Sequence, residues 1–209
     1  MHTNILALRS ARNSRSSKLK LAELAKETDL AVLCAVAENP NASADTLVAL
    51  STSKRSEVRA AVARNSVAPS HVLQNFRWDR CAQVRAAAAA NPLTPPDDLS
   101  RLAADKDLDV RCAVAANTAV ALADLDFLAR SSDPLVRACV AGNARASVKT
   151  LKALAADPNW MVRNAVAGNW PRTPKPVLKK LMRDVIQTVA QTAERYFMLH
   201  QAVVVVGSR

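Results

Sequence analysis

Apolar residues recur along this chain in blocks that repeat every 26 residues, and each block ends in an asparagine. The block that ends at Asn117 carries Val110, Ala113 and Val114, a spacing that places one apolar stripe on a helix. The pattern therefore predicts a short helix before each asparagine. After the first copy, at Asn13, these asparagines are Asn39, Asn65, Asn91, Asn117, Asn143 and Asn169.

A second apolar pair follows each asparagine after a short polar stretch. In the clearest copy this pair is Leu99 and Leu102, which lie three residues apart and so share one helical face. Pro95 stands just before this segment, where the missing N–H of a proline is tolerated because the first turn of a helix leaves that group unpaired. Each 26-residue unit is thus predicted to hold two short helices.

Such a helix pair is too small to bury its apolar face alone, so neighbouring units must stack. Alanine at many of the apolar positions lets helix axes approach to about 8 Å. The constant period over about seven units predicts an all-α solenoid. We interpret the asparagines as structural residues that end each helix in a left-handed backbone conformation.

An arginine follows the first valine of five units, and these arginines form a second ladder. Asp107 precedes Arg111 by four residues, which favours an ion pair within one helix, whereas Asp105 precedes it by six and lies in the preceding loop. A guanidinium could also bridge acids and loop carbonyls of successive units. Binding of a regularly spaced polyanion is the alternative role. The arginines are Arg59, Arg85, Arg111, Arg137 and Arg163.

The unit that runs from Val84-Arg85 through Asn91-Pro92 and Leu99 to Asp105 resembles the leucine-rich repeat variant family of bacteria. This resemblance implies a right-handed superhelix in which each unit pairs an α-helix with a second helix that can be 3₁₀. The chain is also distantly similar to HEAT-type repeats, among which are basic DNA glycosylases. Some family members carry an N-terminal cysteine cluster for an iron–sulfur centre, but the first repeats of this chain offer Cys34 alone. The family has no shared activity to transfer.

Composition and motif searches argue against catalysis. The 209 residues are 50% hydrophobic with 3 glycines, which excludes a disordered chain and a glycine-rich nucleotide loop. The four cysteines form no CxxC pair, and the three histidines are far apart, so we expect no catalytic residue, no metal site and no cofactor. No apolar run is long enough to span a membrane. Unpaired, packed thiols favour a reducing cytoplasmic setting.

The net charge of +11 is concentrated toward both ends of the sequence. Residues 1–90 carry a net +6 and residues 136–209 a net +9, whereas residues 91–135 carry −4. We predict a non-enzymatic scaffold that binds a protein with an acidic surface, with nucleic-acid binding through the basic ends or a glycosylase relative as alternatives. A solvated end face is the simpler explanation for the charge. The candidate binding residues are Arg9, Arg12, Arg15, Arg172, Lys175, Lys179, Lys180 and Arg183.

The sequence predicts a change of organisation near residue 175. Residues 1–174 form the repeat array, and residues 175–209 form a basic helix and tail in which the 26-residue period stops. Apolar residues from Leu178 to Leu199 alternate four and three apart, which predicts one helix of about 25 residues with a heptad seam. This helix caps the last unit of a monomer or joins two copies in a homodimer. Trp160 and Trp170 pack beneath it or form part of a partner surface.

Overall fold

The computed structural model describes the backbone of residues 4–206 and the side chains of residues 4–201, and every regular element in that part is an α-helix. The predicted all-α repeat fold is confirmed. The 3₁₀ alternative is wrong here, because both helices of each unit are α-helical. The tail beyond Gln201 lies outside the described side chains.

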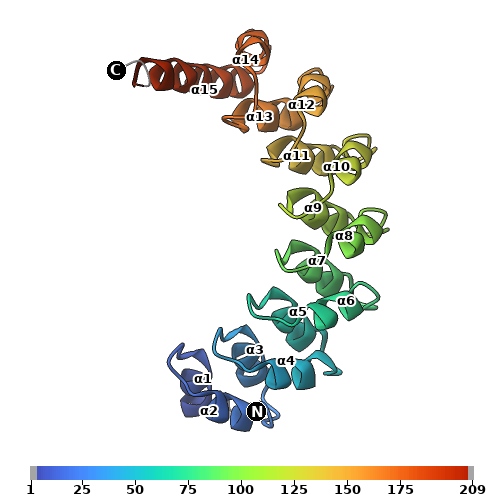
Figure 1. The fold of residues 1–209 in the computed structure, drawn as a ribbon, viewed down its shortest axis with the longest axis vertical. Coiled ribbons are helices and arrows are strands. Elements are labelled where there is room, and N and C mark those ends of the chain that lie inside the picture. Colours follow the sequence, from blue (N-terminus) through green and yellow to red (C-terminus); the bar gives the residue numbers. More distant parts are fainter. Residues whose placement is uncertain (1–3, 207–209) are drawn as a thin grey trace. The chain divides into compact units, whose positions relative to one another are not determined.

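The helices form two compact units, residues 1–119 and residues 120–209 (Figure 1). The odd-numbered helices are α1 (Ile5–Arg12), α3 (Leu30–Glu38), α5 (Ser56–Arg64), α7 (Ala82–Ala90), α9 (Leu108–Ala116), α11 (Pro134–Gly142), α13 (Trp160–Gly168) and α15 (Gln187–Val206). The even-numbered helices are α2 (Lys18–Leu24), α4 (Ala44–Ser51), α6 (Ser70–Phe76), α8 (Pro96–Leu102), α10 (Leu122–Leu128), α12 (Val148–Leu154) and α14 (Lys175–Leu181).

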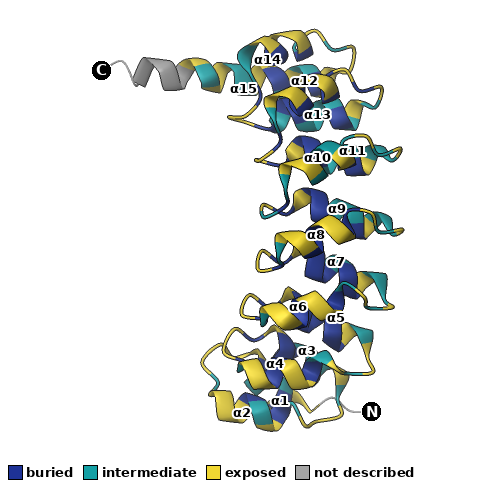
Figure 2. Ribbon diagram, turned by 45° about the vertical axis from the view of Figure 1, so that its right-hand side comes forward, coloured by how far each residue is buried: buried dark blue, intermediate teal, exposed yellow. Residues whose placement is uncertain are grey.

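The odd-numbered helices form the inner layer of each unit. In the first unit α1, α3, α5, α7 and α9 pack in that order, each against the next, and α11, α13 and α15 do so in the second. Each even-numbered helix packs instead against the odd helices beside it in the chain. Figure 2 shows the consequence in the middle of the first unit, where the even helices keep broad exposed faces while the odd helices α3, α5 and α7 are largely buried.

Two columns of side chains make the core. The valines that begin the odd helices are fully buried, and the leucines of the even helices pack against them. These columns are Val32, Val58, Val84, Val110, Val136 and Val162, and Leu21, Leu47, Leu73, Leu99, Leu125, Leu151 and Leu178. Alanines fill the space between the helices, which explains why a chain with 3% aromatic residues still closes its interior.

The helix starts follow from local capping chemistry. The Asp107 carboxylate accepts the N–H of Asp109, and the Asp133 carboxylate accepts the N–H of Leu135, so each aspartate caps the helix that follows it. Pro95 and Pro174 occupy the cap positions of α8 and α14. The sequence placed the start of α8 at Pro95 correctly, because this signal depends on neighbouring residues alone.

The prediction of one heptad helix for the C-terminal segment is wrong, because the segment holds two helices. Residues 182–186 separate α14 from α15, and Val185 in this link is 91% exposed. The repeat nevertheless continues through the C-terminal segment, with one residue inserted before α14. Val189 lies 27 residues after Val162 and is equally buried. The domain boundary at residue 175 stays a prediction.

The helix α15 packs against α13 and α14 as the odd helix of a further unit would. Tyr196 stands where the register calls for the asparagine that ends an odd helix, and α15 runs on through that position to Val206. Thr192 and Tyr196 lie against Gly168 of α13, while Gln191 and Glu194 are exposed. This polar outer face is what the capping unit of a repeat array requires. No helix in the described residues has the length and apolarity to cross a membrane.

Candidate functional site

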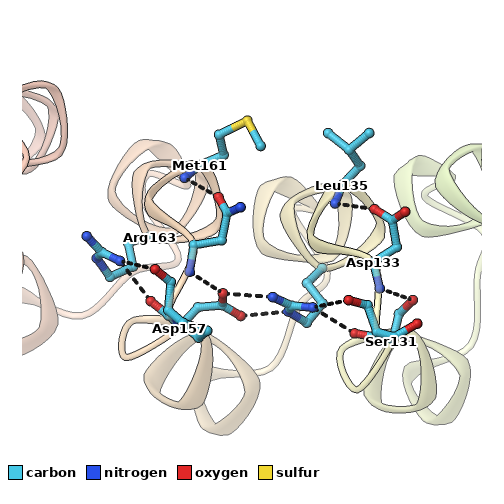
Figure 3. A network of polar contacts seen from close by, with 10 residues as sticks. Ser131, Asp133, Leu135, Asp157, Met161 and Arg163 are labelled. Carbon is cyan, nitrogen blue, oxygen red and sulfur yellow. Dashed lines mark hydrogen bonds and ion pairs between the residues drawn. The ribbon is translucent and has the colours of Figure 1, made fainter.

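The arginine ladder connects successive repeats through bidentate ion pairs. Arg137 donates from Nε and Nη2 to the two carboxylate oxygens of Asp157, at 2.7 and 2.9 Å. Asp157 lies 20 residues downstream, in the loop of the next repeat, and its backbone carbonyl accepts from Nη1 of Arg163 at 2.8 Å. Figure 3 shows Asp157 linking these groups, with Arg163 on one side and the loop of Ser131 on the other. One aspartate thus serves two arginines.

The compact unit of residues 1–119 contains the same arrangement. Arg59 pairs with Asp79 at 2.6 and 2.9 Å, and Arg85 pairs with Asp105 at 2.7 and 2.9 Å. Nη1 of Arg85 donates to the carbonyl of Asp79, which joins the two pairs. The Arg85 and Asp105 side chains are 9% and 10% exposed, so the pair is largely removed from water.

The predicted ion pair within one helix is wrong for Asp107 and Arg111, and Asp133, which stands four residues before Arg137, does not pair with it either. Both aspartates cap their helices, and Arg111 donates instead to the carbonyls of Asp105 and Lys106. The position 20 residues after Arg111 is Ser131, so the ladder sequence lacks an acid there. The second unit ends the series with Arg163 and Asp184, spaced by 21 residues because of the insertion before α14.

The ion pairs shift the carboxyl pKa values. Burial by itself raises the pKa of Asp105, but hydrogen bonds from Arg85 and from the N–H of Asp107 outweigh it and hold the pKa below its usual range. The pKa values of Asp79 and Asp157 are lowered in the same way. For Asp184 the hydrogen bond from Arg163 is the largest influence, and the pKa is again lowered.

These shifts predict loss of stability in acid. A carboxyl whose pKa is lower in the folded state stabilises the fold above its unfolded pKa of about 3.9 and loses that contribution as the pH falls through the folded pKa. We therefore expect the free energy of unfolding to stay nearly constant between pH 7 and about 5, and to decrease once the pH is lower than about 4. Urea denaturation at a series of pH values measures this. The double variant Arg85→Ala/Asp105→Ala should show a shallower fall, and an unchanged slope would contradict the assignment.

The asparagine ladder connects repeats through buried hydrogen bonds. Nδ2 of Asn65 donates to the carbonyls of Ala37 and Asn39 in the preceding repeat, at 2.6 and 3.0 Å. Its Oδ1 accepts the N–H of Val67 at 2.9 Å. The same three bonds recur at Asn39, Asn91 and Asn117, and Nδ2 of Asn169 makes the same two donations. Asn143 is likewise buried, and its Oδ1 accepts the N–H of Arg145.

The left-handed conformation predicted for these asparagines is wrong. Asn65 has φ −66° and ψ 130°, an extended backbone, and no non-glycine residue in the described part of the chain has a positive φ. What the position requires is the amide side chain, because it donates to two carbonyls that the preceding repeat leaves at its own helix end. We propose that both ladders are structural, since their polar groups are used by the fold itself.

The basic residues near the C-terminus separate into two groups. Lys179, Lys180 and Arg183 line a shallow depression of about 680 Å³ together with Val185 and the Arg163–Asp184 pair. Lys179 also lies over the ring of Phe197 on α15, with Nζ 5.6 Å from the ring centre. Arg183 does not lie on the same helix as Lys175 and Lys179, because α14 stops at Leu181 and Arg183 lies in the link that follows.

The remaining two residues of this set lie outside the depression. Arg172 donates from Nη2 to the carbonyl of Ala146 at 3.3 Å, and Lys175 is half-buried in the first turn of α14. Nearby, Trp170 is partly exposed and meets His200 of α15 edge to face, at 6.2 Å between ring centres. Trp160 is 43% exposed.

The basic residues near the N-terminus belong to the first unit. Arg9 and Arg12 lie on α1 and line a shallow depression of about 340 Å³ with Ile5, Leu8 and Asn13. Arg15 follows in the turn before α2, and all three arginines are exposed. In the described part of the chain no acidic side chain forms an ion pair with any of them.

A further cationic feature in the first unit has no counterpart in the repeat pattern. Arg77 pairs with the buried carboxylate of Asp98, and its guanidinium lies 5.3 Å from the ring centre of the exposed Trp78. The corresponding position of the next repeat is Ala103. Sequence reasoning missed this pair because neither residue belongs to a periodic column.

The cysteines and acidic residues show no arrangement suited to metal or nucleophilic chemistry. The residues that the structure describes contain no group of three His, Cys, Asp or Glu side chains able to hold a metal ion. No disulfide joins Cys34, Cys81, Cys112 and Cys139, and each is half-buried. Burial raises the pKa of Cys34, and the nearby Glu38 and Glu57 add to the effect, so its thiol stays protonated and is a poor nucleophile.

Comparison with known proteins identifies the repeat. The sequence model of the leucine-rich repeat variant family matches residues 82–107, the α7–α8 unit. A solved structure described as a leucine-rich repeat variant with a novel repetitive structural motif is 27% identical, covering 91% of this chain and 80% of that one, with a TM-score of 0.60. The Escherichia coli protein YibA has a similar fold, at 15% identity and a TM-score of 0.53, covering 95% and 97% of the two chains. No curated protein sequence matches.

Proposed function

We propose that this chain, whose repeats are leucine-rich repeat variant repeats, is a non-enzymatic scaffold that binds a protein partner with an acidic surface. The fold is one typical of protein-interaction repeats. The observation that carries the proposal is the depression beside α14, where Lys179, Lys180 and Arg183 gather without an acidic partner among the described side chains. The exposed cations at Arg9, Arg12 and Arg15 form a second basic surface.

The charge balance within the C-terminal depression supports an acidic partner. Asp184 is the acid in its lining, and Arg163 already neutralises it with two hydrogen bonds. The three remaining cations are therefore uncompensated. Val185, 91% exposed at the same place, adds an apolar contact that a protein partner can cover. A carboxylate-rich surface with an apolar residue at its centre fits this site.

Several observations favour binding over catalysis. The acidic residues with perturbed pKa values are held by arginines, whereas a base-excision glycosylase would need a free acid in an aromatic pocket. Asp157, the acid nearest in sequence to Trp160, is paired with Arg137. The proposed setting is the cytoplasm, where the four thiols would stay reduced.

Nucleic-acid binding is the second candidate, and the basic composition of both units favours it. The candidate residues of the first unit are arginines, which suit phosphate groups as well as carboxylates. The two functions differ in what the cations recognise. The affinity of the chain for duplex DNA would fall steeply as the salt concentration rises and would depend on both basic surfaces.

We expect charge reversal at the C-terminal depression to abolish binding of an acidic probe. The variant Lys179→Glu/Lys180→Glu/Arg183→Glu should weaken binding of a fluorescent ten-residue glutamate peptide at least tenfold, measured by anisotropy. The matched control Lys149→Glu/Lys152→Glu reverses two exposed cations of α12 in the same unit and should change binding less than threefold.

The same titrations with a 20-base-pair duplex separate the two candidates. Equal loss of peptide binding in both variants would show that net charge alone is responsible, and the proposed site would then be wrong. Duplex binding at physiological salt that exceeds peptide binding would favour the nucleic-acid function. All five side chains are exposed, so we expect both variants to fold, and circular dichroism checks this.

A further inference from the structure

The outer side of α1 leaves a core position uncovered. Leu6 lies 26 residues before Val32, at the head of the valine column. Every later member of that column in the described chain is fully buried, whereas Leu6 is 76% exposed. Ile5 beside it is 76% exposed and Leu19 on α2 is 74% exposed. Leu6 therefore stands at a position that the repeat geometry elsewhere covers with another helix, and Ile5 and Leu19 add exposed apolar surface on the same two helices.

The asparagine ladder is also open at this end. Asn39 donates from Nδ2 to the carbonyls of Ala11 and Asn13, at 2.7 and 2.9 Å, which lie at the C-terminal end of α1. Asn13 occupies the same ladder position one repeat earlier. Its Oδ1 accepts the N–H of Arg15, but within the described residues its Nδ2 has no carbonyl to receive its hydrogen bonds. A helix placed beside α1 would supply them with its last carbonyls.

The charge around this face is predominantly positive. Arg9, Arg12, Arg15 and Lys18 carry no ion pair among the described side chains, and Lys20 pairs with Glu23, the first acid of the sequence. The arginines at the end of α1 also lie where an added parallel helix would place its C-terminal end. That end carries partial negative charge, so the arginines would stabilise it.

We propose that the N-terminal end of the first unit binds an acidic amphipathic helix of a partner protein, in the place of an additional odd helix. The helix runs parallel to α1, packs an apolar residue on Leu6, directs its last carbonyls to Asn13, and meets the arginines with flanking acids. This inference deepens the proposed function at Arg9, Arg12 and Arg15 and rests on it. It does not involve the C-terminal depression.

The same face is poorly suited to a second copy of this chain. Two copies meeting through this end would bring five unneutralised or weakly paired bases of each chain together, which is repulsive. The C-terminal end is not complementary to it either, because α15 continues past Tyr196 and so offers no helix-end carbonyls at the ladder position. Charge complementarity therefore selects an acidic helix.

A pair of helical peptides tests the proposal. Both carry valine and alanine in the odd-helix pattern and a side-chain cross-link that holds the helix. One has glutamate and the other lysine at the flanking positions. We expect the glutamate peptide to bind the full chain at least tenfold more tightly than the lysine peptide. Leu6→Asp and Arg9→Glu/Arg12→Glu should each weaken its binding at least tenfold, and both leave the core intact because these side chains are exposed.

A fusion fills the face by design and serves as the blocking control. A copy of residues 82–107 in place of residues 1–3 continues the 26-residue register, so its first helix would lie where the partner helix is proposed. This fusion should abolish binding of the glutamate peptide. The variant with reversed charges at Lys179, Lys180 and Arg183 should bind it normally, which keeps failure of this inference distinct from failure at the C-terminal site.

Three results would overturn the inference. Equal binding of the two peptides would exclude recognition of acids, and unchanged binding to the fusion would place the peptide elsewhere. A dimer in light scattering that the fusion converts to a monomer would show that a second copy is the occupant.

Discussion

Arg85→Ala is expected to lower the free energy of unfolding by about 3 to 4 kcal/mol, because it leaves a buried carboxylate without its counterion. Asp105 would keep one hydrogen bond, from the N–H of Asp107. It would lose both bonds from Arg85, while the carbonyl of Asp79 would lose its donor. Urea denaturation followed by circular dichroism at pH 7 measures the change.

Arg64→Ala is the matched control for this prediction. Arg64 lies on α5, and its ion pair with Glu38 also joins neighbouring repeats, but both side chains are about half exposed. Exposed pairs contribute about 0 to 1 kcal/mol, so the control should be close to the parent protein. The double variant Arg85→Ala/Asp105→Ala should recover part of the loss, since no unpaired charge remains. Equal losses for Arg85→Ala and Arg64→Ala would show that burial does not govern this ladder.

The repeat pattern predicted the helices well because their signals are local. The spacing of Val110, Ala113 and Val114 sets the buried face of one helix, and Asp107 caps that same helix. The leucine pair of each unit likewise lies on one face within a single turn. Each of these features depends on residues no more than seven positions apart, and the unbroken period then makes one unit a guide to the rest.

The partners of the ladder side chains could not be predicted in this way. Asp105 lies 20 residues after Arg85 and six before Arg111, and sequence distance alone gave more weight to the nearer arginine. Stacking reverses the preference, since it brings the loop of the next repeat against Arg85 and leaves the carbonyl of Asp105 for Arg111. The asparagines do end the helices as predicted, but their side-chain acceptors could not be foreseen for the same reason, because these lie 26 and 28 residues away.

The C-terminal segment shows how an apolar period can mislead. Leu178, Val185 and Val189 fit a heptad seam, yet Val185 is exposed in a link between two helices. The one-residue insertion before α14 shifted the register and hid the continuing repeat. Asp184 preserves it, because its ion pair with Arg163 repeats the geometry of Asp157 with Arg137.

The basic residues of the candidate sites could be named from the sequence, but their grouping could not. Lys179 and Lys180 share the depression with Arg183. Arg172 instead donates a hydrogen bond to the carbonyl of Ala146, in the loop after α11. Exposed cations have no packing partner that fixes them in a pattern, so their arrangement follows from where α14 ends. The uncovered Leu6 was equally invisible, since its sequence resembles that of any buried column position.

Asn65→Ala is the second substitution with a large expected effect, a loss of about 3 kcal/mol in the free energy of unfolding. The side chain that this substitution removes is polar, so little of the expected loss comes from apolar packing. It leaves the carbonyls of Ala37 and Asn39 without their side-chain donor and the N–H of Val67 without its acceptor. An unsatisfied buried polar group destabilises by about 1 to 3 kcal/mol, and water has poor access to a residue that is 3% exposed.

Two further variants separate the hydrogen bonds from other effects of the substitution. Asn75 is exposed on α6, so Asn75→Ala should leave stability unchanged or raise it by about 0.5 kcal/mol through helix propensity. Asn65→Asp keeps an acceptor for Val67 but turns a carboxylate toward two carbonyls that need donors. It should therefore destabilise at least as much as Asn65→Ala at pH 7, and less at pH 4, where a protonated carboxyl can donate once. A milder effect of Asn65→Asp at neutral pH would mean that the acceptor bond, rather than the link between repeats, is what the position provides.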